Sequence, residues 1–298
     1  MIYKEYDCVI AGSGPAGMTA ALYMCRAGYK TALICGNDFP GSLGKINLIE
    51  NYPGVNSCSG MDLAMQMYAQ LDQFEHTELL ERIMFLDAMY IEQHDNNVHV
   101  SLNDYEHILI GKTYIECIGG KHNVLGIKSE EQYLGNGISF CATCDGPLYK
   151  DKNVAIIGGG NSAIDFALTL SKYCREVKII HRRNEFRASP YMIEKTKSLK
   201  NISYLLNTNV IGFNKDTVRD TFEITVSTKY YAEVLSGIHG IFYALGFQSK
   251  KLENKFPNDT KNIFYAGDCV DEKYRQVITA CGDGCKAALD AISFLQLY

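Results

Sequence analysis

The chain has 298 residues, of which 47% are hydrophobic and 21% charged, and its formal net charge is −5. These values are typical of a globular protein of about two domains, and they exclude a disordered or fibrous chain. An acidic chain is not expected to bind nucleic acid, and no apolar run reaches the ~18 residues of a membrane span. No secretory leader precedes the first predicted strand, so we expect a cytoplasmic protein.

The first predicted elements are a buried strand from Tyr6 to Ala11, a glycine-rich turn and a helix from Met18 to Ala27. The turn matches GxGxxG, whose glycines permit a tight turn and the close approach of a pyrophosphate to a helix N-terminus. The candidate contacts are Gly12, Ser13, Gly14, Pro15, Ala16 and Gly17. The motif predicts a dinucleotide site, and a glycine-rich turn without a ligand is the alternative.

The acidic residue that would identify the dinucleotide is not evident. A carboxylate that binds a ribose is expected about 20 residues after the glycines, but Cys35, Gly36 and Asn37 occupy that region and Asp38 comes late. A turn-rich loop follows, in which Asn51 could hold the edge of a cofactor or serve as an ordinary turn residue. The first motif therefore does not say which dinucleotide binds.

The spacing of apolar residues predicts the next elements. It indicates a helix from Met61 to Phe74, an antiparallel hairpin within Tyr90 to Ile110, and a separate short strand from Tyr114 to Ile118.

Cys141 and Cys144 form a CxxC pair that Asp145 follows directly. Two thiols at this spacing can close a small disulfide ring, and their proximity makes dithiol exchange effectively unimolecular. Asp145 could supply or remove the proton, because the thiolate is the nucleophile. Half of a zinc site is the alternative, but structural zinc usually has two spaced pairs, and Cys281 and Cys285 have three residues between them. Most of the eleven cysteines stand alone in apolar segments and are expected to be buried.

A second fingerprint follows the strand Asn153 to Ile157 and precedes a helix from Ile164 to Tyr173. Its candidate contacts are Gly158, Gly160, Asn161, Ser162 and Ala163. Two such motifs in one chain predict two nucleotide-binding units.

The strand Glu176 to Ile180 ends in basic residues, which are His181, Arg182 and Arg183, with Arg187 one helical turn further. Arginines stand where an acid would bind the ribose of NAD, and they suit a 2′-phosphate through bidentate hydrogen bonds. The cofactor predicted here is NADP(H). A solvated basic face is the alternative.

The last third of the chain contains strands within Ile202 to Val226, which we expect to form a small sheet, and a strand from Gly240 to Leu245. A strand from Asn262 to Ala266 ends in Gly267 and Asp268. Arg275, Gln276 and a helix from Val277 to Leu297 come next. Asp268 is placed to accept hydrogen bonds from sugar or ribitol hydroxyls, and a helix N-cap is the alternative.

Taken together and in this order, the motifs resemble the low-molecular-weight thioredoxin reductases over nearly the whole chain. The resemblance implies an α/β fold with two Rossmann-like nucleotide-binding domains, the NADPH domain being inserted in the FAD domain. The FAD domain would be residues 1–117 and 247–298, and residues 118–246 would bind NADPH and carry the redox-active cysteines. Besides the first fingerprint, the FAD contacts would be Gly36, Ser42, Asn51, Gly267, Asp268, Arg275, Gln276 and Val277.

The resemblance also implies an activity. In a homodimer, electrons would pass from NADPH through FAD and the Cys141–Cys144 disulfide to thioredoxin or a thioredoxin-like protein. Cys144 would face the flavin, Cys141 would attack the partner's disulfide, and Asp145 would be the acid-base group. One alternative is a reductase that uses another electron donor such as ferredoxin, and the retained arginine motif favours NADPH instead. A second alternative is a sensor without turnover, and the retained cysteine pair favours an enzyme.

Three features depart from the family pattern. Pro40-Gly41-Ser42 stands where the family has Gly-Gly-Gln, and Lys45 in the same loop could bring a cation near the flavin. The segment between Gly246 and Gly267 is shorter, and Asp165-Phe166 stands where acidic pairs are usual.

Overall fold

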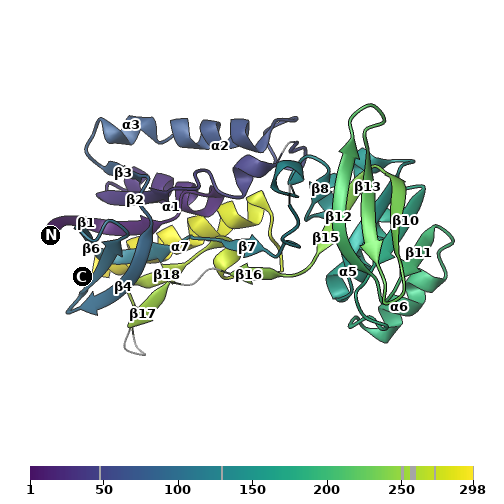
Figure 1. The fold of residues 1–298 in the computed structure, drawn as a ribbon. Helices are drawn as coiled ribbons and strands as arrows, with labels where there is room; N and C mark the ends of the chain where they lie inside the picture. Colours follow the sequence, from purple (N-terminus) through teal and green to yellow (C-terminus); the bar gives the residue numbers. More distant parts are fainter. Residues whose placement is uncertain (47, 129, 250–251, 256–259, 272, 298) are drawn as a thin grey trace. The chain divides into compact units, whose positions relative to one another are not determined.

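The computed structural model of the chain describes residues 1–46, 48–128, 130–249, 252–255, 260–271 and 273–297. Contacts between residues divide the chain into two compact units. Figure 1 labels the helices and strands of both units. Unit 1 consists of Met1–Lys121 and Gln248–Tyr298, and unit 2 is the continuous segment His122–Phe247. Where the chain passes between the units, strands β7 (Gly120–His122) and β16 (Phe247–Ser249) pair with each other.

Unit 1 is built on a sheet in which β3, β2, β1 and β6 are parallel neighbours, and β18 also pairs in parallel with β6. β5 and β4 continue antiparallel from β6, and β17 pairs with β4. The strands are β1 (Ile2–Ala11), β2 (Thr31–Gly36), β3 (Leu80–Met84), β4 (Ala88–His94), β5 (Asn97–Leu102), β6 (His107–Glu116), β17 (Glu253–Lys255) and β18 (Ile263–Tyr265). The helices are α1 (Pro15–Arg26), α2 (Gly60–Ala69), α3 (Asp72–Glu75) and α7 (Val277–Leu297).

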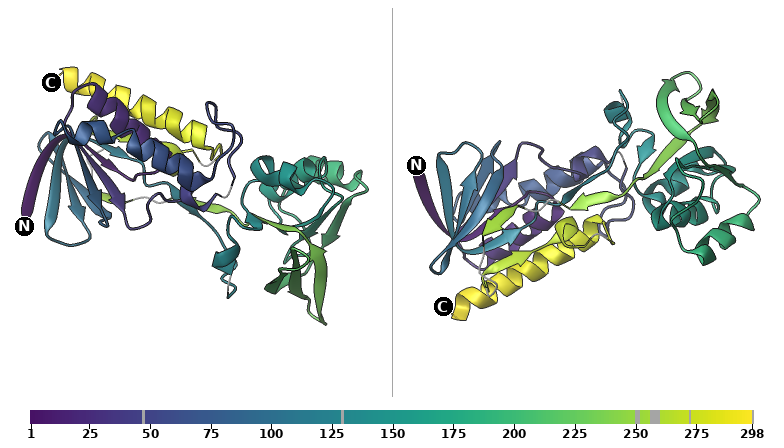
Figure 2. Two further views of the ribbon diagram at one scale, coloured as in Figure 1. Left: turned by 90° about the horizontal axis from the view of Figure 1, so that it is seen from above. Right: turned by 60° about the horizontal axis from the view of Figure 1, so that its bottom comes forward.

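The last four residues of β1, Cys8 to Ala11, are buried on both faces of the sheet, which explains their continuous apolar run. Cys8 and Ile10 pack in the cluster that contains α1 and α7, while Val9 and Ala11 pack with residues of β4 and β5 on the opposite face. Helices α1 and α7 lie side by side, as both views in Figure 2 show. The glycine-rich turn between β1 and α1 follows the carboxyl end of β1, which is an inner strand of this sheet.

Unit 2 repeats the arrangement around a five-stranded parallel sheet of order β11-β10-β9-β15-β8. Val154 and Ile156 pack with α5 and α6, whereas Ala155 and Ile157 pack with the antiparallel sheet β12-β13-β14. The strands are β8 (Ile138–Ser139), β9 (Asn153–Gly158), β10 (Glu176–Ile180), β11 (Ile202–Leu205), β12 (Asn209–Asp216), β13 (Thr221–Ser227), β14 (Ala232–Ile238) and β15 (Gly240–Ala244). The helices are α4 (Ala142–Asp145), α5 (Asn161–Leu170) and α6 (Pro190–Lys197).

The predicted α/β class with two Rossmann-like units is confirmed by these two sheets. Two predicted elements differ from the observed ones in more than their end residues. Tyr114 continues β6 and does not begin a new strand, because the first half of β6 pairs with β5 and the second half with β18. The predicted helix from Met61 to Phe74 divides into α2 and α3 around Leu71, whose side chain is fully buried.

The last third of unit 2 also differs from the expectation. The strands predicted within Ile202 to Val226 do not form one small sheet. β11 joins the parallel sheet beside β10, and only β12 and β13 contribute to the antiparallel sheet. Across the described residues, the structure contains no helix with the length and apolar character needed to span a membrane.

Candidate cofactor and redox sites

The glycines of the first fingerprint have three different environments. Gly12 has a φ of +104°, and an added Cβ would lie 2.4 Å from the carbonyl oxygen of Cys117 in the neighbouring chain segment. A Cβ on Gly17 would lie 1.7 Å from the carbonyl oxygen of Gly12, whereas one on Gly14 would meet nothing within 4 Å. The turn is thus tightly packed at its first and third glycines and open at its second. This pattern fits a pyrophosphate that approaches the backbone at Gly14.

Two other segments of unit 1 meet this turn at Ala16. A Cβ on Gly267 would lie 2.9 Å from the Cβ of Ala16, and one on Gly284 in α7 would lie 2.1 Å from the carbonyl oxygen of Ala16. The end of β18, and with it Asp268, is therefore next to the N-terminus of α1. Tertiary packing brings together these parts of the predicted FAD site, which are more than 200 residues apart in the chain.

Asp268 is half-buried in a short 3-10 turn, Gly267–Cys269. Burial raises the pKa of this carboxyl from 3.8 to about 6, and the charge of Arg275 acts in the opposite direction. Asp268 does not cap α7, which begins at Val277. A half-buried acid with a raised pKa is a reasonable acceptor for ligand hydroxyls.

The remaining predicted FAD contacts of unit 1 are partly brought together. The amide of Asn51 donates to Oε1 of Gln276 at 3.3 Å, although 225 residues separate them. Ser42 directly precedes the 3-10 turn Leu43–Lys45, and Lys45 is paired with Asp38 at 3.1 Å. The hydroxyl of Ser13 donates to the carbonyl of Cys35 at 3.0 Å, which joins the fingerprint to the end of β2.

The second fingerprint is tightly packed and open at the same positions as the first. Gly158 has a φ of +151°, and an added Cβ would lie 2.4 Å from the carbonyl oxygen of Ala244 in β15. A Cβ on Gly160 would meet nothing within 4 Å, and Ala163 at the third position is fully buried. Unit 2 therefore offers the same open second glycine that unit 1 offers at Gly14.

Hydrogen bonds attach the arginine segment to this fingerprint. The amide of Arg187 donates to the carbonyl of Gly159 at 2.7 Å, and the amide of Ser189 donates to Oδ1 of Asn161 at 2.9 Å. The segment from His181 to Ser189 is irregular, so Arg187 does not lie one helical turn further on as expected. The side chains of Arg182, Arg183 and Arg187 are exposed and free to meet an anion.

His181 differs from the three arginines because it is buried. Its Nε2 lies 3.1 Å from the carbonyl oxygen of Glu185, which can only accept, so this nitrogen carries the proton. Burial, followed by the neighbouring arginine charges, lowers its pKa, although the bond to Glu185 acts in the opposite direction. The ring also stacks on Phe186, with centroids 5.6 Å apart. His181 is thus placed to hold the arginine segment in shape.

The cysteine pair lies in unit 2 between β8 and the sheet strand β9. Cys141 and Cys144 form a disulfide with Cα atoms 5.4 Å apart, and Cys144 lies within the short helix α4. The amide of Cys144 donates to Sγ of Cys141 at 3.1 Å. The amide of Asp145 donates to the carbonyl of Cys141 at 3.1 Å, which brings Asp145 back towards the pair.

Ser139 connects Asp145 with the cysteine pair, and sequence reasoning did not single it out. Its hydroxyl accepts from the amide of Cys141 at 3.0 Å. Burial raises the pKa of Asp145, and a hydrogen bond from Ser139 partly offsets this rise. The only sequence signal for Ser139 was a hydroxyl in an otherwise apolar strand. Across the described ranges, no group of three His, Cys, Asp or Glu side chains is arranged to hold a metal ion.

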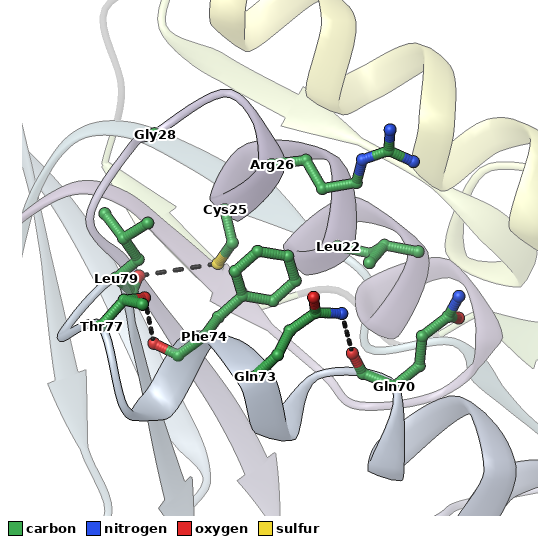
Figure 3. A pocket seen from close by; sticks show the side chains of 9 residues that line it. All are labelled: Leu22, Cys25, Arg26, Gly28, Gln70, Gln73, Phe74, Thr77 and Leu79. Carbon is green, nitrogen blue, oxygen red and sulfur yellow. Dashed lines mark hydrogen bonds between the residues drawn. The ribbon is translucent and has the colours of Figure 1, made fainter.

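A pocket in unit 1 is separate from these sites (Figure 3). It lies between the second half of α1 and the segment from Gln70 to Leu79. The thiol of Cys25 lies there and donates to the carbonyl of Leu79 at 3.6 Å, and burial raises its pKa to about 11. The lining contains no predicted site residue, so this pocket is not part of the cofactor site.

Comparisons with known proteins identify the family of this chain. The chain matches the family model described as pyridine nucleotide-disulphide oxidoreductase over residues 6–284. It is 35% identical to the thioredoxin reductase of Mycoplasma genitalium, over 95% of this chain and 93% of that protein. It is 32% identical to the bifunctional thioredoxin reductase/thioredoxin of Mycobacterium leprae, over 97% of this chain and 66% of that protein.

A solved structure gives the same result at the level of the fold. The crystal structure of thioredoxin reductase from Streptococcus pyogenes has a TM-score of 0.88 and 28% identity, and the match covers 99% of both chains. The chain therefore belongs to the pyridine nucleotide-disulphide oxidoreductase family, and within it to the thioredoxin reductases.

Proposed function

We propose that this chain is an NADPH-dependent thioredoxin reductase in which unit 1 holds FAD and unit 2 holds NADPH and the redox-active disulfide. The observation that carries the proposal is the combination of a Cys141–Cys144 disulfide with two fingerprints that are open at their second glycine. The cofactors of the family, FAD and NADPH, account for both fingerprints. Neither fingerprint would be needed by a dithiol protein that worked alone.

Bound FAD would supply two-electron redox chemistry between NADPH and the disulfide. The residues that would hold it are the turn Gly12 to Gly17, Asn51 with Gln276, and Asp268. Backbone amides at the start of α1 suit the pyrophosphate, and the half-buried carboxylate of Asp268 suits ribitol hydroxyls. For NADPH, the open backbone at Gly160 would receive the pyrophosphate, and Arg182, Arg183 and Arg187 would bind the 2′-phosphate.

The cysteine pair performs the exchange. Two electrons and two protons convert the disulfide into two thiols, and Cys141 as thiolate then attacks one sulfur of the partner's disulfide to form a mixed disulfide. Cys144 attacks that mixed disulfide, re-forms the ring and releases the partner as a dithiol. The hydrogen bond from the amide of Cys144 to Sγ of Cys141 favours the thiolate at Cys141, which supports its role as the attacking group.

Asp145 would move the protons that this exchange requires. Burial raises the pKa of Asp145 towards the working pH, where a carboxyl group can both donate and accept a proton. The hydrogen bond from Ser139 lowers this pKa in part. The alternative electron donor, ferredoxin, is not favoured, because the chain retains an open second fingerprint and three exposed arginines beside it.

For the disulfide partner we propose thioredoxin or a thioredoxin-like protein. One relative is named a bifunctional thioredoxin reductase/thioredoxin, which supports this choice. We also propose a homodimer in the cytoplasm, which the resemblance to the low-molecular-weight reductases implies.

An anaerobic titration tests the proposal. The purified chain with bound FAD is titrated with NADPH and, separately, with NADH, and the flavin absorbance is followed before thioredoxin is added. We expect rapid bleaching by NADPH and recovery of the colour with oxidised thioredoxin. Bleaching by reduced ferredoxin but by neither nucleotide would contradict the assignment, and so would a folded chain that takes up no FAD.

A further inference from the structure

Unit 1 lacks a carboxylate where a dinucleotide site of this type usually has one. In such sites the strand after the fingerprint ends in an acid that accepts a hydrogen bond from the adenosine ribose. Here that strand, β2, ends at Gly36, and Asn37 follows. Neither residue has a carboxyl group.

A carboxylate nevertheless occupies this place, and it comes from another part of the chain. Gly36 has a φ of +71°, and an added Cβ would lie 2.6 Å from Oδ1 of Asp87. Asp87 lies between β3 and β4, fifty residues beyond Asn37. Its carboxylate therefore fills the space into which a side chain of residue 36 would extend.

Hydrogen bonds hold Asp87 in this position. The amide of Asp87 donates to Oδ1 of Asn103 at 3.1 Å, and the amide of Asn103 donates to the carbonyl of Asp87 at 3.0 Å. The side-chain amide of Asn37 donates to Oδ2 of Asp87 at 2.7 Å. The turn before it is unusual as well, because Phe85 has a φ of +63°, a conformation that costs energy for a bulky residue.

The carboxylate also has capacity left for a ligand. Two oxygens offer about four acceptor positions, and Asn37 supplies a bond of 2.7 Å to one oxygen and a longer one of 3.4 Å to the other. Asp87 is exposed, so a ribose hydroxyl can reach it. Asp87 lies beside the carboxyl end of β2. The fingerprint turn also lies at this end, because the hydroxyl of Ser13 donates to the carbonyl of Cys35 in β2.

We propose that Asp87 is the residue that binds the adenosine ribose of FAD, through a hydrogen bond from the 2′-hydroxyl to its carboxylate. The carboxylate reaches the usual position from the β3–β4 connection and not from β2. This inference rests on the proposed binding of FAD by unit 1.

The test compares FAD with an analogue that lacks the adenosine 2′-hydroxyl. Both are titrated calorimetrically into the full-length chain after removal of its flavin. We expect the unchanged chain to bind FAD at least about ten-fold more tightly than the 2′-deoxy analogue, the effect of a hydrogen bond to a charged group. Asp87→Ala is expected to bind the two flavins alike, while FMN, which has no adenosine, binds both proteins equally.

Asp290→Ala is the matched control, because it removes an exposed carboxylate elsewhere in unit 1. It should keep the preference for FAD. An unchanged chain that bound both flavins equally would overturn this inference while leaving the proposed function intact, and that measurement requires no variant. Asp87→Ala with an undiminished preference would also overturn it, whereas an unchanged chain that bound no FAD would contradict the proposed function as well.

Discussion

The imidazole of His181 lies directly against the α-carbon of Gly159, so that an added Cβ would meet Nδ1 at 2.2 Å. The central glycine of the second fingerprint and the first basic residue after β10 thus form one packed unit. The bond from the amide of Arg187 to the carbonyl of Gly159 strengthens this connection. The glycine turn and the arginine segment therefore contact each other at Gly159.

Gly159→Ala is expected to displace His181 and the arginine segment, lower the free energy of unfolding by about 1–3 kcal/mol, and weaken NADPH binding. Gly160→Ala is the matched control, because its Cβ enters open space. That variant should keep its stability and still bind NADPH weakly, since the methyl group obstructs the ligand. Thermal unfolding and NADPH titration check both, and equal stability of the two variants would contradict this contact.

Arg182→Gln combined with Arg183→Gln is expected to raise the KM for NADPH about ten-fold or more while changing that for NADH little. The reason is the loss of charge-assisted hydrogen bonds to a phosphate that NADH does not have. Arg219→Gln serves as a control, because Arg219 is an exposed arginine elsewhere in unit 2. Steady-state kinetics with both nucleotides measure the effect. Equal losses with NADPH and NADH would argue against the 2′-phosphate site.

Cys141→Ser and Cys144→Ser are each expected to abolish thioredoxin reduction while NADPH still bleaches the flavin. Each variant lacks one sulfur of the disulfide, so exchange cannot be completed. Cys174→Ser, at a buried cysteine of the same unit, should retain activity. Stopped-flow absorbance and a thioredoxin assay separate the two half-reactions. Full thioredoxin reduction by either active-pair variant would show that electrons take another route.

FAD binding by the flavin-free chain is expected to strengthen as the pH rises from 5 to 7. The pKa of Asp268 is raised to about 6, so the carboxyl is mostly protonated at pH 5 and ionised at pH 7. Ligand hydroxyls that donate to Asp268 bind the ionised form better, and affinity therefore increases through this pKa. Asp268→Asn should show a flat profile over this range. A wild-type profile equally flat would exclude Asp268 as the acceptor.

Ser139→Ala is expected to raise the pKa of Asp145 further, because the serine hydroxyl bond that stabilises the carboxylate is lost. The pH profile of thioredoxin reduction should then move to higher pH. The rate of flavin reduction by NADPH should not change. A profile that shifts to lower pH, or a loss confined to stability, would contradict the role of Ser139.

The elements that depend on local spacing could be predicted from the amino-acid sequence. The limits of β10 and α7 match the predicted ones, since apolar periodicity and the flanking residues belong to the segment itself. Both fingerprints and the CxxC motif were visible for the same reason. The strand break predicted before Tyr114 failed because β6 receives its second partner, β18, from a distant part of the chain.

The chemical neighbours of these motifs were decided only by the tertiary structure. Asn51 meets Gln276 across 225 residues, and Asp87 occupies the space beside Gly36 from a different connection. Ser139 contacts Asp145 because β8 ends beside the short helix that holds the cysteines. Sheet pairing and the crossing of α1 with α7 bring such groups together, and these long-range contacts leave no periodic pattern in the sequence. The motifs themselves are local, whereas the carboxylates and hydroxyls that complete them are supplied by packing.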